Sequence, residues 1–331
     1  MNDRSRIIVY WLSLSVSCAA LVLVFQQVDF AKALFTLKQL NYVLILVAMI
    51  LQLGVTLVIA LRWSLFFSEV PRLKNLIRGL FVAQLVNFIM PIRVGALVRI
   101  YIVARREHFS KLMVLTTVIS EKIFDSLAFF ILFLTVTPIF APQWFQISSV
   151  GFTSILLALL FPLFFLISRK RKQIVNLFEG LNQKFSWIQY SKAIERLSNG
   201  LKVFQQVRDT KNITRLWCAT VAISFLGCLV NYAVLRAFDI EVPFTAAVLL
   251  LVTLQIGVRL IPTAPLGGIG IFQLICIETL AFFSVDRDVA ISYSLILQLV
   301  IFVPGSVLGW FFVHNMRYSL TRLKAEAEDL K

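Results

Sequence analysis

Residues 262–272 read PTAPLGGIGIF, which places two prolines and three glycines between strongly apolar runs at 244–261 and 271–283. Soluble proteins place such a cluster in a surface loop. In the hydrocarbon core of a membrane, irregular backbone is tolerated only where protein or a water-filled cavity covers its polar groups. The stretch therefore predicts two helices interrupted at membrane depth beside a polar cavity, with a simple Gly/Pro kink as the alternative.

The composition is that of an all-α polytopic membrane protein. Of the 331 residues, 59% are hydrophobic and 15% are charged, and the mean hydropathy is +0.87. The net charge of +15 fits the Lys and Arg that membrane proteins collect on the cytoplasmic side, so no nucleic-acid partner is expected. The four cysteines lie in apolar segments without CxxC or His-partnered spacing, and we expect no metal and no cofactor.

Six apolar runs are long enough to cross about 30 Å of hydrocarbon as helices. They lie at 7–25, 41–61, 112–137, 150–168, 213–236 and 289–313. The segments 62–78 and 105–111 are basic, whereas the loop 138–149 carries no charge. The positive-inside rule therefore predicts a multi-pass protein of the cell inner membrane with both termini in the cytoplasm. The following basic residues are interpreted as cytoplasmic anchors: Arg62, Arg72, Lys74 and Arg78.

A second interrupted region, 79–104, begins and ends on the predicted cytoplasmic side and contains Pro91 and Gly95 at its centre. Each apolar piece is about a dozen residues, too short to cross the hydrocarbon at about 1.5 Å per residue. This region therefore predicts a re-entrant hairpin. The region 244–284 fits either a re-entrant hairpin entering from outside or two full crossings.

The two interrupted regions resemble each other. Gln84 stands seven residues before Pro91, and Gln255 stands seven residues before Pro262. Glycine, a short apolar segment and a long helix follow each break. Because one hairpin would open inward and the other outward, the pattern predicts an inverted-topology repeat.

The predicted repeat divides the chain into a first transmembrane half (1–168), a basic linker (169–212) and a second half (213–331). The linker has apolar residues every three or four positions, which predicts amphipathic helices on the inner membrane surface. Gly305 and Gly309 form the one Gly-x-x-x-Gly pair in the long spans, a candidate dimer seam.

Polar residues beside the two breaks are candidate ligands for a lipid headgroup. Arg93, Arg99 and Arg259 carry guanidinium groups, which match a phosphate with two parallel hydrogen bonds. The neutral candidates around them are Gly95, Gly267, Gly268, Gly270, Gln84, Asn87, Gln255 and Gln273, with Gln298 nearby in the sequence pattern. Glycines would allow the backbone to approach the ligand closely.

Further charges at membrane depth are expected to form a buried network, since isolated charges there are costly. The candidates are Glu121, Lys122, Asp125 and Glu278. One interpretation pairs Arg99 with Glu121 or Asp125, and Arg259 with Glu278. The other leaves part of the arginine charge for a phosphate.

Three motifs in order resemble one family. PIRVGALVRIYIVARR (91–106), a helix with SEKIFD (120–125), and PLGGIGIFQ (265–273) are similar to patterns of the lysylphosphatidylglycerol synthase transmembrane-region family, also called flippase-like domain proteins. The matching positions are Arg93, Gly95, Arg99, Glu121, Asp125, Gly267, Gly268 and Gly270. The resemblance extends over essentially the whole chain and implies a role in handling membrane lipids.

The chain departs from the family pattern at two acids. Ala96 follows Gly95 where the family has an acid, and Gln273 stands at the late acidic position. The loss of both acids puts a cationic headgroup in doubt and favours an anionic one. The soluble aminoacyl-transfer domain of the full synthases is also absent from this sequence, so no synthesis of lysyl-lipid is expected.

These observations predict a lipid translocase rather than an enzyme, moving a phospholipid or a lipid- or polyprenyl-linked anionic headgroup through a polar cavity. Its partners would be membrane lipids. An alternative is an accessory protein that positions a glycosyltransferase or a lipid-modifying enzyme through the basic linker. A third is a membrane-embedded transferase with Glu121 or Asp125 as its base. There is no GxxxxGK loop, so direct use of ATP is not expected.

Overall fold

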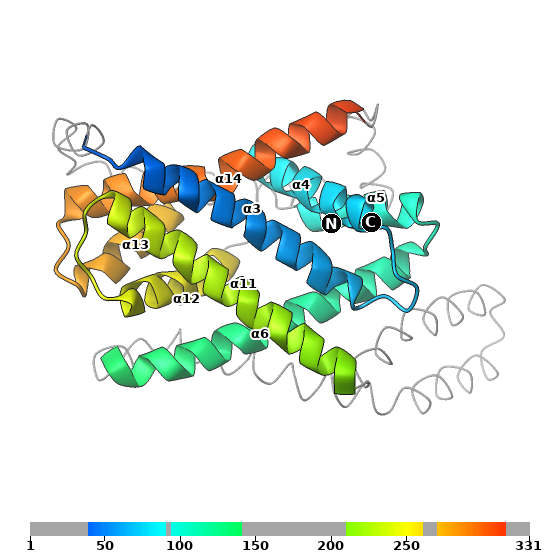
Figure 1. The fold of residues 1–331 in the computed structure, drawn as a ribbon, viewed down its shortest axis with the longest axis horizontal. Helices are drawn as coiled ribbons and strands as arrows, with labels where there is room; N and C mark the ends of the chain where they lie inside the picture. The colour runs from blue at the N-terminus through cyan, green and yellow to red at the C-terminus, as the bar shows by residue number, and fades with distance from the viewer. Residues whose placement is uncertain (1–38, 91–93, 141–209, 261–269, 316–331) are drawn as a thin grey trace, which may run out of the picture. The chain divides into compact units, whose positions relative to one another are not determined.

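The computed structural model describes residues 39–90, 94–140, 210–260 and 270–315, and all regular structure within them is α-helical. Eight helices follow one another along this part of the chain (Figure 1). They are α3 (Tyr42–Ser64), α4 (Leu73–Ile89), α5 (Gly95–Arg106), α6 (Lys111–Phe140), α11 (Thr210–Ala237), α12 (Phe244–Leu260), α13 (Ile271–Ala281) and α14 (Arg287–Asn315). The expected all-α fold is confirmed for these residues.

Three of the described helices, α3, α11 and α14, are long and apolar enough to cross a membrane. They coincide with the predicted spans at 41–61, 213–236 and 289–313. The predicted span 112–137 lies within α6, a helix of 30 residues that is not among these three, so its crossing of the membrane stays a prediction. The predicted spans 7–25 and 150–168 lie outside the described residues, as does nearly all of the linker 169–212.

Helices α4 and α5 pack against each other as an antiparallel hairpin. The backbone carbonyl of Ala83 and the side chain of Asn87 lie against Gly95, while Gly79, earlier on α4, faces Val103, later on α5. The helices have 17 and 12 residues. At about 1.5 Å per residue they are ~25 Å and ~18 Å long, each shorter than the ~30 Å hydrocarbon core.

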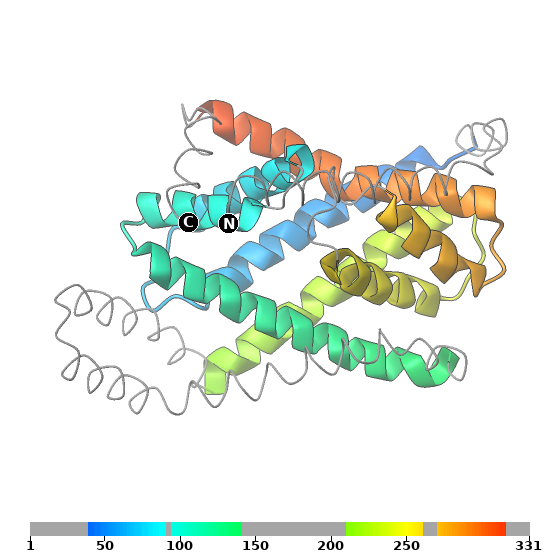
Figure 2. The ribbon, with the colours of Figure 1, turned by 180° about the vertical axis from the view of Figure 1, so that it is seen from behind.

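Helices α12 and α13 form a second antiparallel pair. The hydroxyl oxygens of Thr253 and Thr279 are 3.1 Å apart, and Gly257, one turn later on α12, faces Ile275, one turn earlier on α13. The helices have 17 and 11 residues. α13 also packs against α14, and both ribbon views show α12, α13 and the start of α14 side by side (Figures 1 and 2).

The described helices belong to two compact units. The first comprises Met1–Leu57, Leu80–Val98 and Ile223–Lys331, and the second comprises Val58–Gly79 and Arg99–Ala222. Each unit combines segments from both predicted halves of the sequence. The boundaries between the units fall within α3, within the α4–α5 hairpin and within α11, so each of these contributes to both units. The predicted division of the chain into two halves and a linker stays a prediction.

Within the first unit, α14 packs closely on α4 through two glycines. A Cβ atom added at Gly309 would collide with the backbone carbonyl of Phe81 and would lie 2.9 Å from Cβ of Leu85. A Cβ atom added at Gly305 would collide with the side-chain oxygen of Gln84. The Gly-x-x-x-Gly pair thus serves close helix packing within the chain, which corrects its interpretation as a dimer seam.

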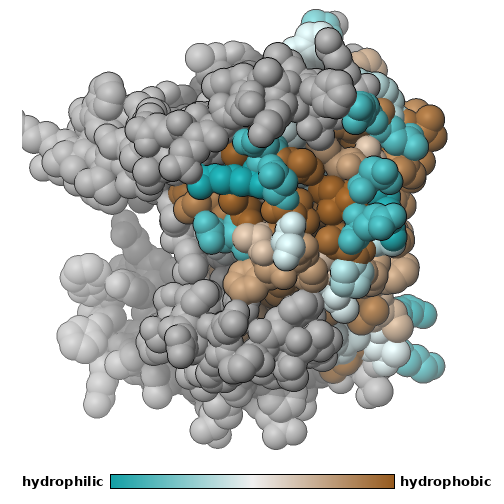
Figure 3. Space-filling model, turned by 90° about the vertical axis from the view of Figure 1, so that its left-hand side faces the viewer, coloured by the Kyte–Doolittle hydropathy of each residue, from teal (hydrophilic) through white to brown (hydrophobic). Residues whose placement is uncertain are grey.

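One end of the first unit carries the short connections from α11 to α12 and from α13 to α14. Figure 3 views this end and shows hydrophilic patches separated by hydrophobic surface. Its exposed charged residues are Arg236, Asp239, Glu241, Asp286 and Arg287. Apolar helices that end in charged connections are typical of segments that leave the hydrocarbon at a membrane surface.

Candidate functional site

Arg62 lies at the centre of a buried ion-pair network in the second unit. Its side chain is 1% exposed, and Nη2 lies 2.6 Å from Asp125 Oδ1 and 3.9 Å from Glu121 Oε1. Nη1 donates a hydrogen bond to Thr220 Oγ1 at 3.1 Å. Nε is buried and has no hydrogen-bond partner among the described residues. A buried guanidinium is tolerated here because carboxylates on α6 balance its charge.

Arg99 brings α5 into the same network. Its Nη1 lies 3.0 Å from Glu121 Oε2, so Arg99 binds one of the two acids expected from the sequence. The guanidinium carbon also lies 4.7 Å from the centroid of the Trp63 ring, a cation–π contact. Trp63 is held in place because its Nε1 donates to Thr117 Oγ1 at 2.9 Å. The Arg99 guanidinium is therefore held by the Glu121 carboxylate and by the Trp63 ring.

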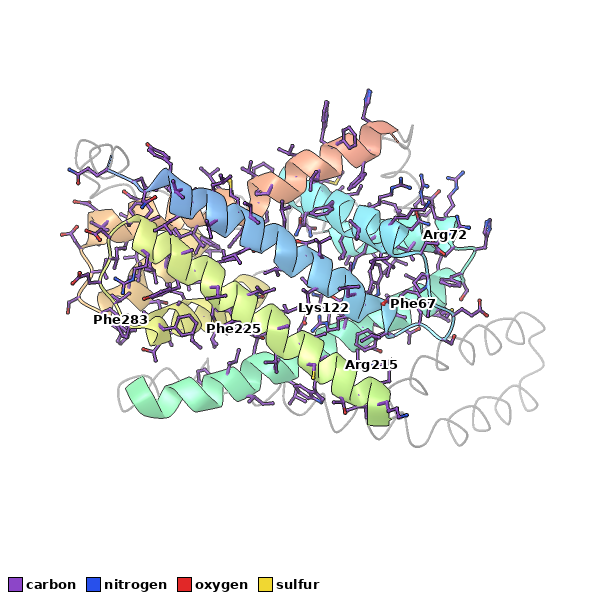
Figure 4. All side chains as sticks on the ribbon, viewed as in Figure 1. Phe67, Arg72, Lys122, Arg215, Phe225 and Phe283 are labelled. Atoms are coloured by element: carbon purple, nitrogen blue, oxygen red, sulfur yellow. The ribbon has the colours of Figure 1, made fainter. Side chains whose placement is uncertain are left out.

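Lys122 lies at the edge of this network on α6 (Figure 4). Its side chain is 54% exposed, while Nζ lies 3.3 Å from Asp125 Oδ2 and 3.8 Å from Glu121 Oε1. The expectation that Lys122 is buried is wrong. Successive residues on a helix are turned by about 100°, so the residue after an inward-facing Glu121 points sideways.

We call Arg62, Arg99, Glu121, Lys122 and Asp125 the charge network. Its residues come from α3, α5 and α6, and α11 adds the Thr220 hydroxyl. Its members alternate in sign, so each carboxylate contacts at least two cations. Such an arrangement can bind an external oxyanion in exchange for a carboxylate, because guanidinium and ammonium groups bind both by charge-assisted hydrogen bonds.

In the first unit, the polar side chains at the second break bind each other through amides. Gln273 Oε1 accepts from the backbone N–H of Gly270 at 2.6 Å, and its Nε2 donates to Gln298 Oε1 at 2.6 Å. Gly270 has a φ of 92°, which glycine adopts without strain. Gln273 is fully buried. A glutamine can make both contacts at once, because its amide carries an acceptor for Gly270 and a donor for Gln298.

The polar side chains at the first break also have structural partners in the first unit. Gln84 Nε2 donates to Thr56 Oγ1 at 3.2 Å, whereas its buried Oε1 lies against Gly305 with no hydrogen-bond partner among the described residues. Asn87 Oδ1 accepts from the backbone N–H of Gly95 at 2.8 Å, which satisfies an amide of the first turn of α5. Both side chains therefore hold helices together in the absence of a ligand.

Other predicted site residues are placed differently. Glu278 is exposed on α13, which corrects its expected position in a buried network. Leu274, one turn earlier, is also exposed, so this face of α13 points away from α12 and α14. Gln255 lies half-buried on α12. Arg93, Gly267 and Gly268 lie outside the described residues, and for Arg259 only the helical backbone is described.

Sequence reasoning missed Arg62, because a basic residue directly after an apolar span usually anchors the helix at the membrane surface. Here Arg62 lies in the last turn of α3 and turns inward to the second unit. One signal could have identified it. Glu121 and Asp125 share a helix face from which Lys122 is turned by about 100°, so the two acids on that face require a second cation besides Arg99.

Comparison with known proteins finds one family. The family described as lysylphosphatidylglycerol synthase TM region matches residues 10–309. No curated protein and no solved structure matches the chain. The match covers most of the chain, including the motifs that contribute Arg99, Glu121 and Asp125 to the charge network. The chain therefore belongs to the lysylphosphatidylglycerol synthase TM region family and is a multi-pass, lipid-related membrane protein.

Proposed function

We propose that this protein is a lipid translocase that moves an anionic lipid across the membrane. The observation that carries the proposal is the charge network, because it places charged side chains inside a helix predicted to cross the bilayer. Ionisable residues at membrane depth are retained where they serve a substrate or ion pathway. Family membership supports a role with membrane lipids, and the sign of the charge network supports an anionic headgroup.

The depth of Lys122 supports a pathway rather than a purely structural cluster. At about 1.5 Å per residue, Lys122 lies ~16 Å along α6 from its start. A lysine can extend toward the membrane surface when it is near a helix end. Lys122 is about three turns from that end, so in a helix that crosses the bilayer its half-exposed ammonium requires a polar neighbour or water.

The two helical hairpins support the same proposal. In each, a glycine of the first helix faces a side chain of the second, at Gly79 with Val103 and at Gly257 with Ile275. Their helices are too short to cross the hydrocarbon alone. We propose that both hairpins are re-entrant and related as an inverted repeat. Broken helices of this kind provide polar sites near the membrane midplane in transporters.

In the proposed mechanism, the headgroup moves along the charge network while the acyl or prenyl chains remain in the bilayer. The phosphate exchanges with a carboxylate for cationic partners, so the headgroup does not lose its charge compensation. We propose that the protein lies in the cell inner membrane with both termini in the cytoplasm. Exposed Arg72, Lys74, Arg105 and Lys111 near the hairpin base support this orientation.

The test is a translocation assay in vesicles that contain purified protein and a trace of fluorescent phospholipid in both leaflets. A membrane-impermeant reductant quenches the outer leaflet at once and reaches inner-leaflet lipid only if the protein moves it. For anionic lipids, we expect the protein to lower the fraction of fluorescence that remains after the reductant is added. Arg99→Gln should slow it and Arg72→Gln, a change at an exposed arginine, should not. Failure to move any lipid of a broad anionic and zwitterionic panel would overturn the proposal.

A further inference from the structure

Lys122 differs from the two arginines of the charge network in how completely its charge is held. Arg62 and Arg99 are 1% and 5% exposed, whereas the Lys122 side chain is 54% exposed. Arg62 binds two carboxylates and a hydroxyl, and Arg99 is bound by Glu121 and the Trp63 ring. Lys122 is therefore the cation of the charge network that a ligand can reach.

The charge balance of the network indicates the charge of that ligand. Counted over the described residues alone, the charge network has three cations, Arg62, Arg99 and Lys122, and two carboxylates, Glu121 and Asp125, which is an excess of one positive charge. A charge at membrane depth without a counter-charge is costly. One further negative charge would complete the balance.

We infer that Lys122 binds the phosphodiester of a lipid headgroup with one net negative charge, and that this contact selects the lipid that the protein carries. This inference rests on the proposed function and specifies its substrate class. An ammonium offers three hydrogen-bond donors, so Lys122 can bind a phosphate oxygen while keeping its contact with Asp125. A zwitterionic headgroup adds a cation and leaves the excess charge in place. A phosphomonoester, with up to two negative charges, exceeds the balance.

Binding of short-chain lipids to purified full-length protein in detergent tests this selection. The probes are dihexanoyl forms of phosphatidylglycerol, a monoanionic diester, phosphatidylcholine, a zwitterion, and phosphatidic acid, a monoester. We expect phosphatidylglycerol to bind most tightly. Lys122→Ala should weaken that binding about ten- to a hundredfold, the usual value of a hydrogen bond to a charged group, with phosphatidylcholine unchanged. Lys122→Arg should restore most of the affinity.

Lys111→Ala is the matched control, because Lys111 is an exposed lysine of the same helix outside the charge network. It should leave the preference unchanged. Glycerophosphoglycerol, the same diester without acyl chains, separates a lipid site from a site for free phosphate compounds and should compete much more weakly. Equal competition by this compound would overturn the lipid assignment.

Equal binding of phosphatidylglycerol to the wild type and to Lys122→Ala would overturn the inference, as would equal wild-type affinity for phosphatidylcholine. Lys122→Ala and Lys122→Arg should unfold at the wild-type temperature, since the Lys122 side chain is half exposed. Translocation in vesicles is a separate readout. If the wild type moves no lipid, the proposed function fails while the binding ratios still decide the role of Lys122. If lipids move without dependence on Lys122, the proposed function stands and the inference fails.

Discussion

The two compact units solve the problem of polar groups at membrane depth in different ways. In the second unit, charge compensates charge, as between Arg62 and Asp125 at 2.6 Å. In the first unit, uncharged amides bind each other and the backbone, as Gln273 binds Gln298 at 2.6 Å. A charged partner can be exchanged for an ionic ligand, whereas an amide pair gains little from one. The difference supports the proposal that the charge network of the second unit recognises the ligand, while the amides of the first unit hold helices together.

The largest expected effect comes from removing a carboxylate of the charge network. Glu121→Ala would leave Arg99 buried without its acid and would remove one acid from Arg62. Breaking a buried ion pair on one side costs about 3–5 kcal/mol of unfolding free energy. Thermal unfolding of the purified protein in detergent measures it. Glu69→Ala, at an exposed acid after α3, should change little.

A paired replacement sharpens this prediction. Arg62→Met combined with Asp125→Leu removes both charges of one pair, so it should be markedly less destabilising than Arg62→Met alone. Translocation should nevertheless be lost, because the pair would be absent from the pathway. If the double variant keeps full transport, the Arg62–Asp125 pair has no role in recognition.

A smaller effect is expected at the amide pair of the first unit. Gln273→Glu restores the acid that the family has at this position but turns the donor to Gln298 into an acceptor. Gln298 would have to turn its amide to donate to the new carboxylate, and the buried carboxylate would have no cation beside it among the described residues, which together cost about 1–3 kcal/mol. A second change, Gln298→Lys, would supply a cation opposite the introduced carboxylate and should recover part of the loss. Stability as high as wild type for Gln273→Glu alone would contradict the assigned hydrogen bonds.

The smallest expected effect concerns helix packing. Gly309→Ala adds a methyl group against the backbone of α4, where the Phe81 carbonyl cannot turn away, so we expect a loss of about 1 kcal/mol or slightly more. Gly54→Ala adds the same group where no atom lies within 4 Å. That change should be neutral or stabilising by up to ~1 kcal/mol, because alanine favours helix. Equal effects at the two positions would contradict the close contact of α14 with α4.

Much of the architecture could be predicted from hydropathy and from breaks in it. Apolar runs of sufficient length predicted α3, α11 and α14, and the prolines and glycines predicted where the helices of each hairpin end. The membrane path of the hairpins and the repeat stay predictions. The composition of the two units could not be predicted, because it depends on which helix faces meet, and hydropathy in an all-apolar segment does not distinguish them.

In the candidate site, too, the sequence does not show which way a side chain on a helix points. The sequence identified Glu121 and Asp125 from their spacing on one helix face. It misassigned Arg62, since the position of a residue after a span does not reveal whether its side chain turns outward or inward. It also placed Lys122 and Glu278 in a buried network, although each lies on the outer face of its helix. For Arg62 the deciding contacts are with residues far along the chain, whereas for Lys122 the turn of the helix between successive residues decides.

Accessibility of position 122 to water in the membrane tests the central claim most directly. In a background without Cys18, Cys218, Cys228 and Cys276, Lys122→Cys and Val221→Cys would be treated in vesicles with a charged thiol reagent. Both positions are exposed, and each lies the same number of residues from the start of its helix, α6 or α11. Because the reactive thiolate forms in water, the account predicts labelling at position 122 and none at 221. No labelling at 122, or equal labelling at both positions, would contradict it.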